Sequence, residues 1–351
     1  MSSETLKIFL AMAAYMLVVI GIGLFFAKRA QANSENYFLG GRSLGPWVAA
    51  MSAEASDMSG WLLMGLPGVA YWCGISDAMW TALGLAIGTY INWLVVARRL
   101  RRYSAVSGDA ITVPDFLSNR FHEKKKVILG ISAVFILVFF TVYAASCFVT
   151  CGKLFSTLFG FSYHSMMIAG AIFVVVYTFI GGFLAESASD FMQAVVMVIA
   201  LITILVLGTI SAGGVGAVID NARSIPGFFS PTAIATPVVD ANGVQQAAGG
   251  VPQFGEAGSY GFLTIISTLS WGLGYFGVPQ VLLRFMAIRK EEQLKQSRRI
   301  ATVWCVISLF SAVSIGLIGR ALLPAESSLA TSSGAENVFV MLSQTLLPPV
   351  L

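Results

Sequence analysis

The stretch "SAEASDMSGWLLMGLPG", residues 52–68, places two carboxyl side chains, Glu54 and Asp57, inside a strongly apolar part of the chain. A carboxylate in the middle of a membrane costs at least ~2.5–3.5 kcal/mol, so it persists where it meets water, a cation or a partner. Glycines and a proline follow at once, and they release backbone carbonyls from the helical ladder. A small hard cation prefers oxygen ligands of both kinds. The stretch therefore predicts a cation site at a break in a membrane helix, the alternative being that Asp57 only caps a half-helix.

Glu54 lies one helical turn before Asp57 and shares its face of the helix. Both a direct role for Glu54 and the simple lining of a cavity remain open.

The composition indicates an integral membrane protein of several spans, and we expect an all-α fold. It is 57% hydrophobic and 11% charged with a mean hydropathy of +0.81, whereas a soluble domain carries about 25% charged residues. The first apolar run, 6–27, is long enough to span a membrane and has no small-residue cleavage site after it, so no cleavable signal peptide is expected. The four cysteines are expected to be buried thiols, and two histidines predict no metal-ligand cluster.

Hydropathy predicts eight spans, at 6–27, 45–73, 75–97, 127–158, 164–183, 191–211, 260–286 and 300–322. With the amino terminus outside, all but four of the 21 Lys and Arg residues lie on the inner side, the exceptions being Lys7, Lys153, Arg223 and Arg320. This is a strong positive-inside pattern. The basic runs at 98–102 and 124–126 therefore indicate topology rather than nucleic-acid binding. The outer loop 212–259 is nearly uncharged and rich in Pro, Gly, Ala and Ser; we expect a flexible connector, with a partly ordered lid as the alternative.

A second interrupted span is "SWGLGYFGVPQ", residues 270–280, in which three glycines and Pro279 break an apolar run. Trp271 and Tyr275 lie one turn apart and share a face, which favours contact with a substrate over an interfacial aromatic belt. The stretch also matches GxGxxG, but no strand precedes it, so a dinucleotide site is not expected. Two broken spans are typical of transporters built from inverted repeats.

These stretches resemble the sodium:solute symporter family, together with "YFLGGRSLGPWVAAM" (37–51), "ALGLAIGTYINWLVVARRLR" (82–101), "VFFTVYAAS" (138–146), "YTFIGGFLAESASDFMQA" (177–194) and "VLLRFMA" (281–287). The resemblance covers nearly the whole chain, except the long outer loop. The resemblance implies a single membrane transport domain with the leucine-transporter-type inverted-repeat fold. An extra helix at 6–27 precedes a complete first five-helix repeat at 45–211. The outer loop 212–259 then leads to the start of a second repeat at 260–351. That repeat is expected to be truncated here, with the helix that supplies two hydroxyl ligands to sodium lying beyond residue 351.

The resemblance implies a sodium-coupled symporter, not an enzyme, that imports L-proline across the cytoplasmic membrane by alternating access. Sodium, L-proline and membrane lipid are the implied partners, with no nucleic acid and no obligate protein partner. The implied sodium ligands are Ala55, Asp57, Met58 and Ser59. The implied substrate residues are Ser59, Gly60, Trp61, Gly65, Tyr143, Trp271, Tyr275 and Pro279. Arg42 and Asp190 match coupling and ion-path positions.

Three alternatives remain open at this stage. The first is another small organic solute, which different pocket residues at Gly65, Tyr275 and Pro279 would indicate. The second is a transporter-like membrane sensor, which a long soluble carboxyl-terminal extension would reveal. A membrane enzyme is the third, although no nucleophile–base pair is apparent and His164 is a lone histidine near the outer surface.

Overall fold

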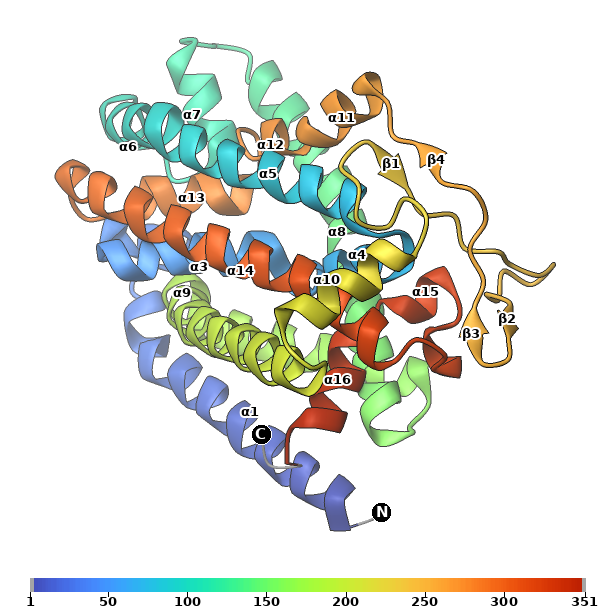
Figure 1. Cartoon of the computed structure of the whole chain (residues 1–351). Coiled ribbons are helices and arrows are strands. Elements are labelled where there is room, and N and C mark those ends of the chain that lie inside the picture. Colours follow the sequence, from blue (N-terminus) through green and yellow to red (C-terminus); the bar gives the residue numbers. More distant parts are fainter. Residues whose placement is uncertain (1–2, 349–351) are drawn as a thin grey trace.

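The computed structural model describes residues 3–348 and is mostly helical (Figure 1). In the first half the α-helices are α1 (Ser3–Ala30), α2 (Ser34–Leu39), α3 (Pro46–Met58), α4 (Gly65–Cys73), α5 (Ile75–Ile91), α6 (Ala97–Val106), α7 (Val113–Arg120) and α8 (Val127–Phe159). Short helical turns join them at η1 (Gly40–Arg42), η2 (Ser59–Leu62) and the π-helical η3 (Asn92–Val96).

The second half begins with the longest helix, α9 (Tyr163–Ser211), and continues through α10 (Val215–Ser224), α11 (Phe262–Leu269), α12 (Trp271–Gly274), α13 (Pro279–Ala287), η4 (Glu291–Gln293) and α14 (Leu294–Leu322). It ends with η5 (Ser327–Leu329), α15 (Ser332–Ala335) and α16 (Val338–Leu346). Four two-residue strands, β1 (Ala233–Ile234), β2 (Ala247–Ala248), β3 (Val251–Pro252) and β4 (Gly258–Ser259), form two antiparallel pairs, β1–β4 and β2–β3.

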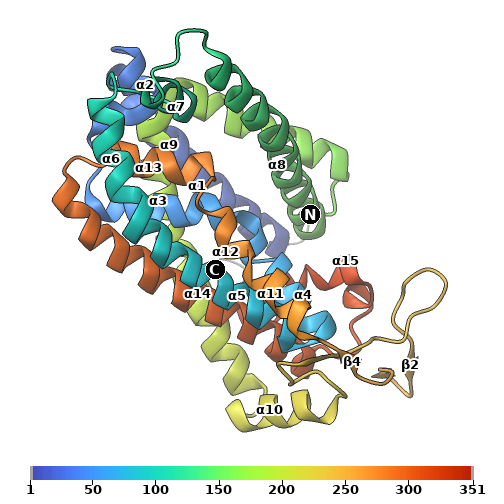
Figure 2. The same ribbon diagram turned by 90° about the horizontal axis from the view of Figure 1, so that it is seen from above.

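Five helices within residues 3–348, or six if α11–α13 is one bent span, are long and apolar enough to cross a membrane. The difference from the predicted eight has a local cause. α9 bends at Gly182, where φ is 58° and ψ is −160°, and its two arms match the predicted spans 164–183 and 191–211 (Figure 2). α3 and α4, with 13 and 9 residues, are each too short to span alone and together fill the predicted span 45–73. The count of eight and the inverted repeat stay predictions.

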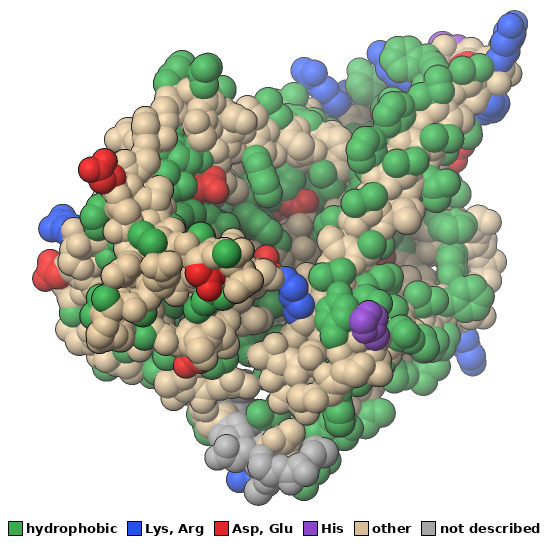
Figure 3. All heavy atoms as spheres, turned by 90° about the vertical axis from the view of Figure 1, so that its right-hand side faces the viewer, with side chains coloured by type: hydrophobic (Ala, Val, Ile, Leu, Met, Phe, Trp, Pro, Cys, Tyr) green, Lys and Arg blue, Asp and Glu red, His purple; other side chains and the backbone are tan. Residues whose placement is uncertain are grey.

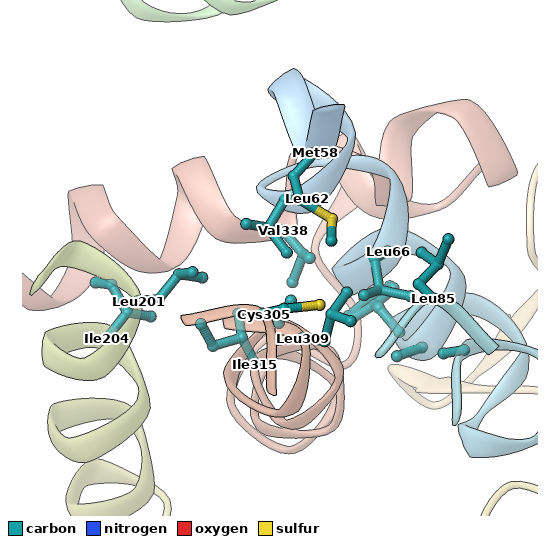
Figure 4. Packing of buried hydrophobic residues seen from close by; sticks show 14 of the residues in the cluster. Met58, Leu62, Leu66, Leu85, Leu201, Ile204, Cys305, Leu309, Ile315 and Val338 are labelled. Carbon is teal, nitrogen blue, oxygen red and sulfur yellow. The ribbon is translucent and has the colours of Figure 1, made fainter. Parts of the chain in front are cut away.

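The main hydrophobic core surrounds α14, which packs against α3, α4, α5 and α9. Aliphatic side chains from all five helices interlock there, among them Met58, Leu66, Leu85, Leu201 and Leu309 (Figure 4). Because helices in a membrane gain little from the hydrophobic effect, close packing and small residues at contacts hold them together.

Glycines allow the closest of these approaches, between α5 and α12. A Cβ atom at Gly88 would lie 2.3 Å from the carbonyl oxygen of Gly272, and one at Gly272 would lie 2.0 Å from that of Gly84. The two helices therefore touch backbone to backbone, which fixes α12 against the first half of the chain.

The expectation that 212–259 is a flexible connector is wrong, because the segment is folded and attached to the helix ends (Figure 1). The Ile75 N–H donates to the Phe228 carbonyl at 2.9 Å, and the Ala235 N–H donates to the Cys73 carbonyl at 3.1 Å. Arg320, expected to be an outer helix-end charge, is buried and donates to Gln245 Oε1 at 3.0 Å. These anchors come from distant parts of the chain, so the composition of the loop gave no sign of them.

The four cysteines are free thiols, but only Cys305 is buried. Cys73, Cys147 and Cys151 are partly exposed, which corrects the expectation that all four are buried.

Candidate functional site

The break in the first span falls where the sequence predicted it. α3 ends at Met58, and Ser59 takes a positive φ of 46° with ψ of −156°. This left-handed backbone region costs a non-glycine residue on the order of 1–3 kcal/mol and is found mainly at functional sites. The Ser59 N–H still donates to the Ala55 carbonyl, so that proposed ligand carbonyl is not fully released from the helical ladder. Asp57 therefore lies in the last turn of a half-helix, beside an irregular segment that runs to Gly65.

The second break is also confirmed. α12 ends at Gly274, Val278 is extended, and Pro279 opens α13 at a bend of 41°. The freed carbonyl of Tyr275 accepts a 2.7 Å hydrogen bond from Asn92 Nδ2. Asn92 begins the π-helical turn η3 and was not predicted as a site residue. Its signal in the sequence was a lone amide in an apolar span.

The two breaks face each other. The buried Tyr275 hydroxyl lies 3.5 Å from Met58 Sδ and interacts with the Asp57 carboxyl. The Trp61 and Trp271 rings pack with centroids 5.6 Å apart and planes tilted by 31°. Trp271 is 54% exposed whereas Tyr275 is 7% exposed, so the predicted aromatic pair has one member at the rim and one inside.

α8 closes another side of the first break. The Tyr143 hydroxyl donates to the Ser56 carbonyl at 3.0 Å. A Cβ atom at Gly60 would lie 2.7 Å from Thr150 Cγ2, so a glycine there lets α8 approach. Tyr143 and Gly60 therefore both lie at the first break, and their proposed part in binding the substrate stays a prediction.

Gly65 and Pro279 have more specific surroundings than the prediction assumed. A Cβ atom at Gly65 would lie 2.5 Å from Trp61 Cδ1, so Gly65 makes room for the indole ring. Pro279 lines an apolar cavity of about 490 Å³ with side chains of α7, α8 and α13, including Leu137 and Leu283. Pro279 contributes to that cavity rather than to the Trp61–Trp271 pair.

Glu54 is buried, with 3% of its surface exposed, and accepts a 3.2 Å hydrogen bond from Trp93 Nε1. This partner is a neutral donor, so it does not compensate a negative charge. Together with Asp57, Glu54 makes one face of α3 acidic. On the side that carries residues 212–259 the molecular surface is hollowed, and acidic side chains lie in the hollow (Figure 3).

The opposite face of α3 carries a buried ionic cluster around Arg284 of α13. Its guanidinium lies 2.9 Å from Asp190 Oδ2 and 3.0 Å from Glu186 Oε1, both on α9. Ser52 and Ser56 of α3 donate to the same Asp190 oxygen at 2.8 and 2.7 Å. Since successive helical residues are about 100° apart, Ser52 and Ser56 point away from Glu54. The cluster ties α3, α9 and α13 together.

The sequence did not predict that Arg284 and Glu186 belong to this cluster. Arg284 was counted among the inner-loop charges, but it is 1% exposed within the helix bundle, which corrects that assignment. Its guanidinium also lies 5.0 Å from the Phe183 ring centroid. Glu186 was given no role. The signal available was spacing: Glu186 and Asp190 lie one turn apart on an apolar helix and require a cation.

Arg42 joins three segments at the end of the bundle where α6 and α13 end. Its guanidinium bonds Asp109 Oδ1, the Ala110 carbonyl and the Met286 carbonyl, each at 2.9 Å. Together these bonds join the end of α13, through Arg42 of η1, to the segment after α6. A coupling residue would be expected at such a junction, although no contact joins Arg42 directly to Asp57.

Comparison with known proteins agrees with this geometry. The sequence pattern of the sodium:solute symporter family matches residues 37–351. The chain belongs to the sodium:solute symporter family. The family is one of sodium-coupled secondary transporters, not of enzymes, and its members lie in membranes, as the apolar helices here require.

Sodium/proline symporters of Staphylococcus aureus strains USA300 and COL are 42% identical to the chain over 343 residues. The alignment covers 98% of this chain and 62% of each relative, so the chain spans less than two thirds of their length. A solved structure of a Na+-coupled sialic acid symporter has the same fold, with a TM-score of 0.76 at 16% identity, covering 98% of this chain and 67% of that one.

Proposed function

We propose that the protein is a sodium-coupled symporter that imports L-proline across the cytoplasmic membrane by alternating access, with its amino terminus outside. Family membership supports sodium coupling, and the identity to the sodium/proline symporters supports proline. The observation that carries the proposal is the contact between the two helix breaks, through Tyr275, Met58 and Asp57. A cation held at the first break is thereby in contact with the element that would hold the solute.

In this proposal sodium is bound by the Asp57 carboxylate, the Ala55 and Met58 carbonyls, and Ser59. Hard cations take oxygen ligands, and these groups meet at the end of a half-helix whose carbonyl dipoles point toward a cation.

L-Proline binds next to sodium in the proposed mechanism. Its ring packs against Tyr275 and the Trp61–Trp271 pair. The remaining proposed substrate residues, at the break and around it, are Ser59, Gly60, Gly65, Tyr143 and Pro279. Binding of both solutes orders the irregular segment 59–64, which allows the outer side to close and the inner side to open.

Asp190 is proposed to lie on the sodium exit path and Arg42 to couple inner opening to it. The Arg284 guanidinium already forms an ion pair with the Asp190 carboxylate. Sodium that leaves Asp57 on this path would therefore compete with an arginine for that carboxylate. Such competition keeps the exit closed until α13 moves.

The driving force suffices for accumulation. One sodium ion crossing 100 mV releases ~2.3 kcal/mol, and a tenfold sodium gradient adds roughly 1.4 kcal/mol. With tight coupling, these sustain a proline gradient of about 500-fold.

The test is uptake of labelled L-proline into vesicles with an imposed sodium gradient, for wild type and Asp57→Asn. We expect the variant to lose at least about tenfold in apparent sodium affinity, because a charge-assisted ligand is worth about 1.5–3 kcal/mol. Asp220→Asn, an exposed carboxyl on α10, is the matched control. Wild-type sodium affinity in Asp57→Asn would contradict the sodium site. Sodium-driven uptake of a different solute, with none of proline, would contradict the substrate while leaving the coupling intact.

A further inference from the structure

A charged cavity lies between α6 and the start of α14, at the end of the bundle where most Lys and Arg residues gather. Its volume is about 490 Å³. The charged side chains that line it are Arg98, Arg102, Lys295, Arg298, Glu291 and Glu292. None of them belongs to the two helix breaks or to the Arg284 cluster.

The charges in this cavity do not balance. Arg98 Nε lies 2.6 Å from Glu291 Oε1, so the opposite charges of these two residues neutralise each other. Arg102, Lys295 and Arg298 then face one remaining acid, Glu292, which leaves an excess of two positive charges. A pocket of this sign attracts an anion from the inner surface of the membrane.

Arg298 is held in position with part of its hydrogen-bonding capacity unused. Its guanidinium lies 5.2 Å from the ring centroid of Tyr90, which fixes the side chain. Its Nε is buried without a hydrogen-bond partner among residues 3–348. A buried N–H donor without a partner costs free energy, so an oxygen acceptor that binds next to it is favoured. Arginine recognises phosphate oxygens through such donors.

An exposed apolar strip adjoins the cavity. It is formed by α5, η3 and α14, which pack together, and comprises Ile87, Tyr90, Leu94, Val303, Ile307 and Phe310. Ile87, Tyr90 and Leu94 follow helical spacing, so they form one face. Tyr90 and Leu94 bring this face to the cavity, where Tyr90 meets Arg298 and Leu94 forms part of the wall.

We propose that this cavity binds the phosphate headgroup of an anionic phospholipid of the inner leaflet, with the acyl chains lying along the strip. The shared chemistry is a phosphate oxyanion, which free phosphate also offers. The strip favours the lipid, because acyl chains can pack on exposed apolar side chains next to the charges, whereas a free phosphate ion cannot. The site is independent of which solute the protein carries.

Native mass spectrometry of the purified protein with dioleoyl phosphatidylglycerol tests the proposal. The variant is the triple substitution Arg102→Gln, Lys295→Gln and Arg298→Gln, which leaves the Arg98–Glu291 pair intact. We expect its apparent affinity for phosphatidylglycerol to fall at least about tenfold, since each basic group near a membrane surface contributes several-fold. Dioleoyl phosphatidylcholine should bind wild type no better than the variant.

The matched control is the triple substitution Lys124→Gln, Lys125→Gln and Lys126→Gln. It removes the same charge from exposed positions in the loop between α7 and α8, outside the cavity. An equal loss of phosphatidylglycerol affinity in both triple variants would show that only the net charge matters, and it would overturn the proposal. So would displacement of bound lipid by millimolar inorganic phosphate, which would indicate a free-anion site. If the triple variant does not fold, the affinity of the single variant Arg298→Gln for phosphatidylglycerol is measured instead. An affinity equal to that of wild type would refute the site.

Discussion

Replacing Arg284 with glutamine should destabilise the protein more than removing the charge of an exposed basic residue. The side chain is 1% exposed, and its guanidinium touches two carboxylates, at 2.9 and 3.0 Å, and two serine hydroxyls. Breaking a buried ion pair by removing one partner costs about 3–5 kcal/mol, because the other charge is left buried and unpaired. We expect Arg284→Gln to lower the free energy of unfolding by that amount.

A compensating variant separates the ionic effect from lost packing. Arg284→Gln combined with Asp190→Asn and Glu186→Gln removes all the charges of the cluster. Because a neutral, hydrogen-bonded cluster carries no unpaired charge, the triple variant should be more stable than Arg284→Gln by at least about 1–3 kcal/mol.

Cys305 provides the assay. It is fully buried, so its reaction with a thiol-specific dye reports unfolding once the three partly exposed cysteines are replaced by serine. Labelling is followed against denaturing detergent for each variant. Arg299→Gln, an exposed arginine on α14, is the control and should change stability by at most ~0.5 kcal/mol. An Arg284→Gln protein as stable as this control would refute the reasoning, as would a triple variant less stable than the single one.

Three further predictions concern the contacts that hold the site. Gly88→Ala should cost about 1–3 kcal/mol by pushing α5 from the Gly272 carbonyl, whereas Gly130→Ala, where a Cβ meets nothing within 4 Å, should not destabilise; detergent unfolding compares them. Arg320→Met should loosen residues 212–259, so limited proteolysis should cut there faster while the helices stay intact, and unchanged cutting would contradict the anchor. Tyr275→Phe should weaken sodium-dependent proline binding by about 3- to 30-fold, measured in vesicles, because it removes the hydroxyl beside Asp57 while keeping the ring; unaltered affinity would place the hydroxyl outside the site.

The sequence alone predicted the membrane class, both helix breaks and the acidic residue at the first. These features follow from local chemistry. An apolar run of spanning length, a carboxyl within it, and glycine or proline next to it have few physical explanations in lipid, since unsatisfied backbone groups and bare charges are costly there. Asp57, Gly274 and Pro279 carried that information without reference to the rest of the chain.

The tertiary structure decided which groups meet. Arg284 looks in sequence like another basic residue at a span end, and only the packing of α13 against α3 and α9 turns it into the partner of Asp190. Likewise Arg320 and the folded segment 212–259 depend on contacts more than 70 residues apart. Hydropathy measures what a residue prefers on average, whereas burial of a charge becomes possible only when distant groups supply its hydrogen bonds, and no local pattern records that.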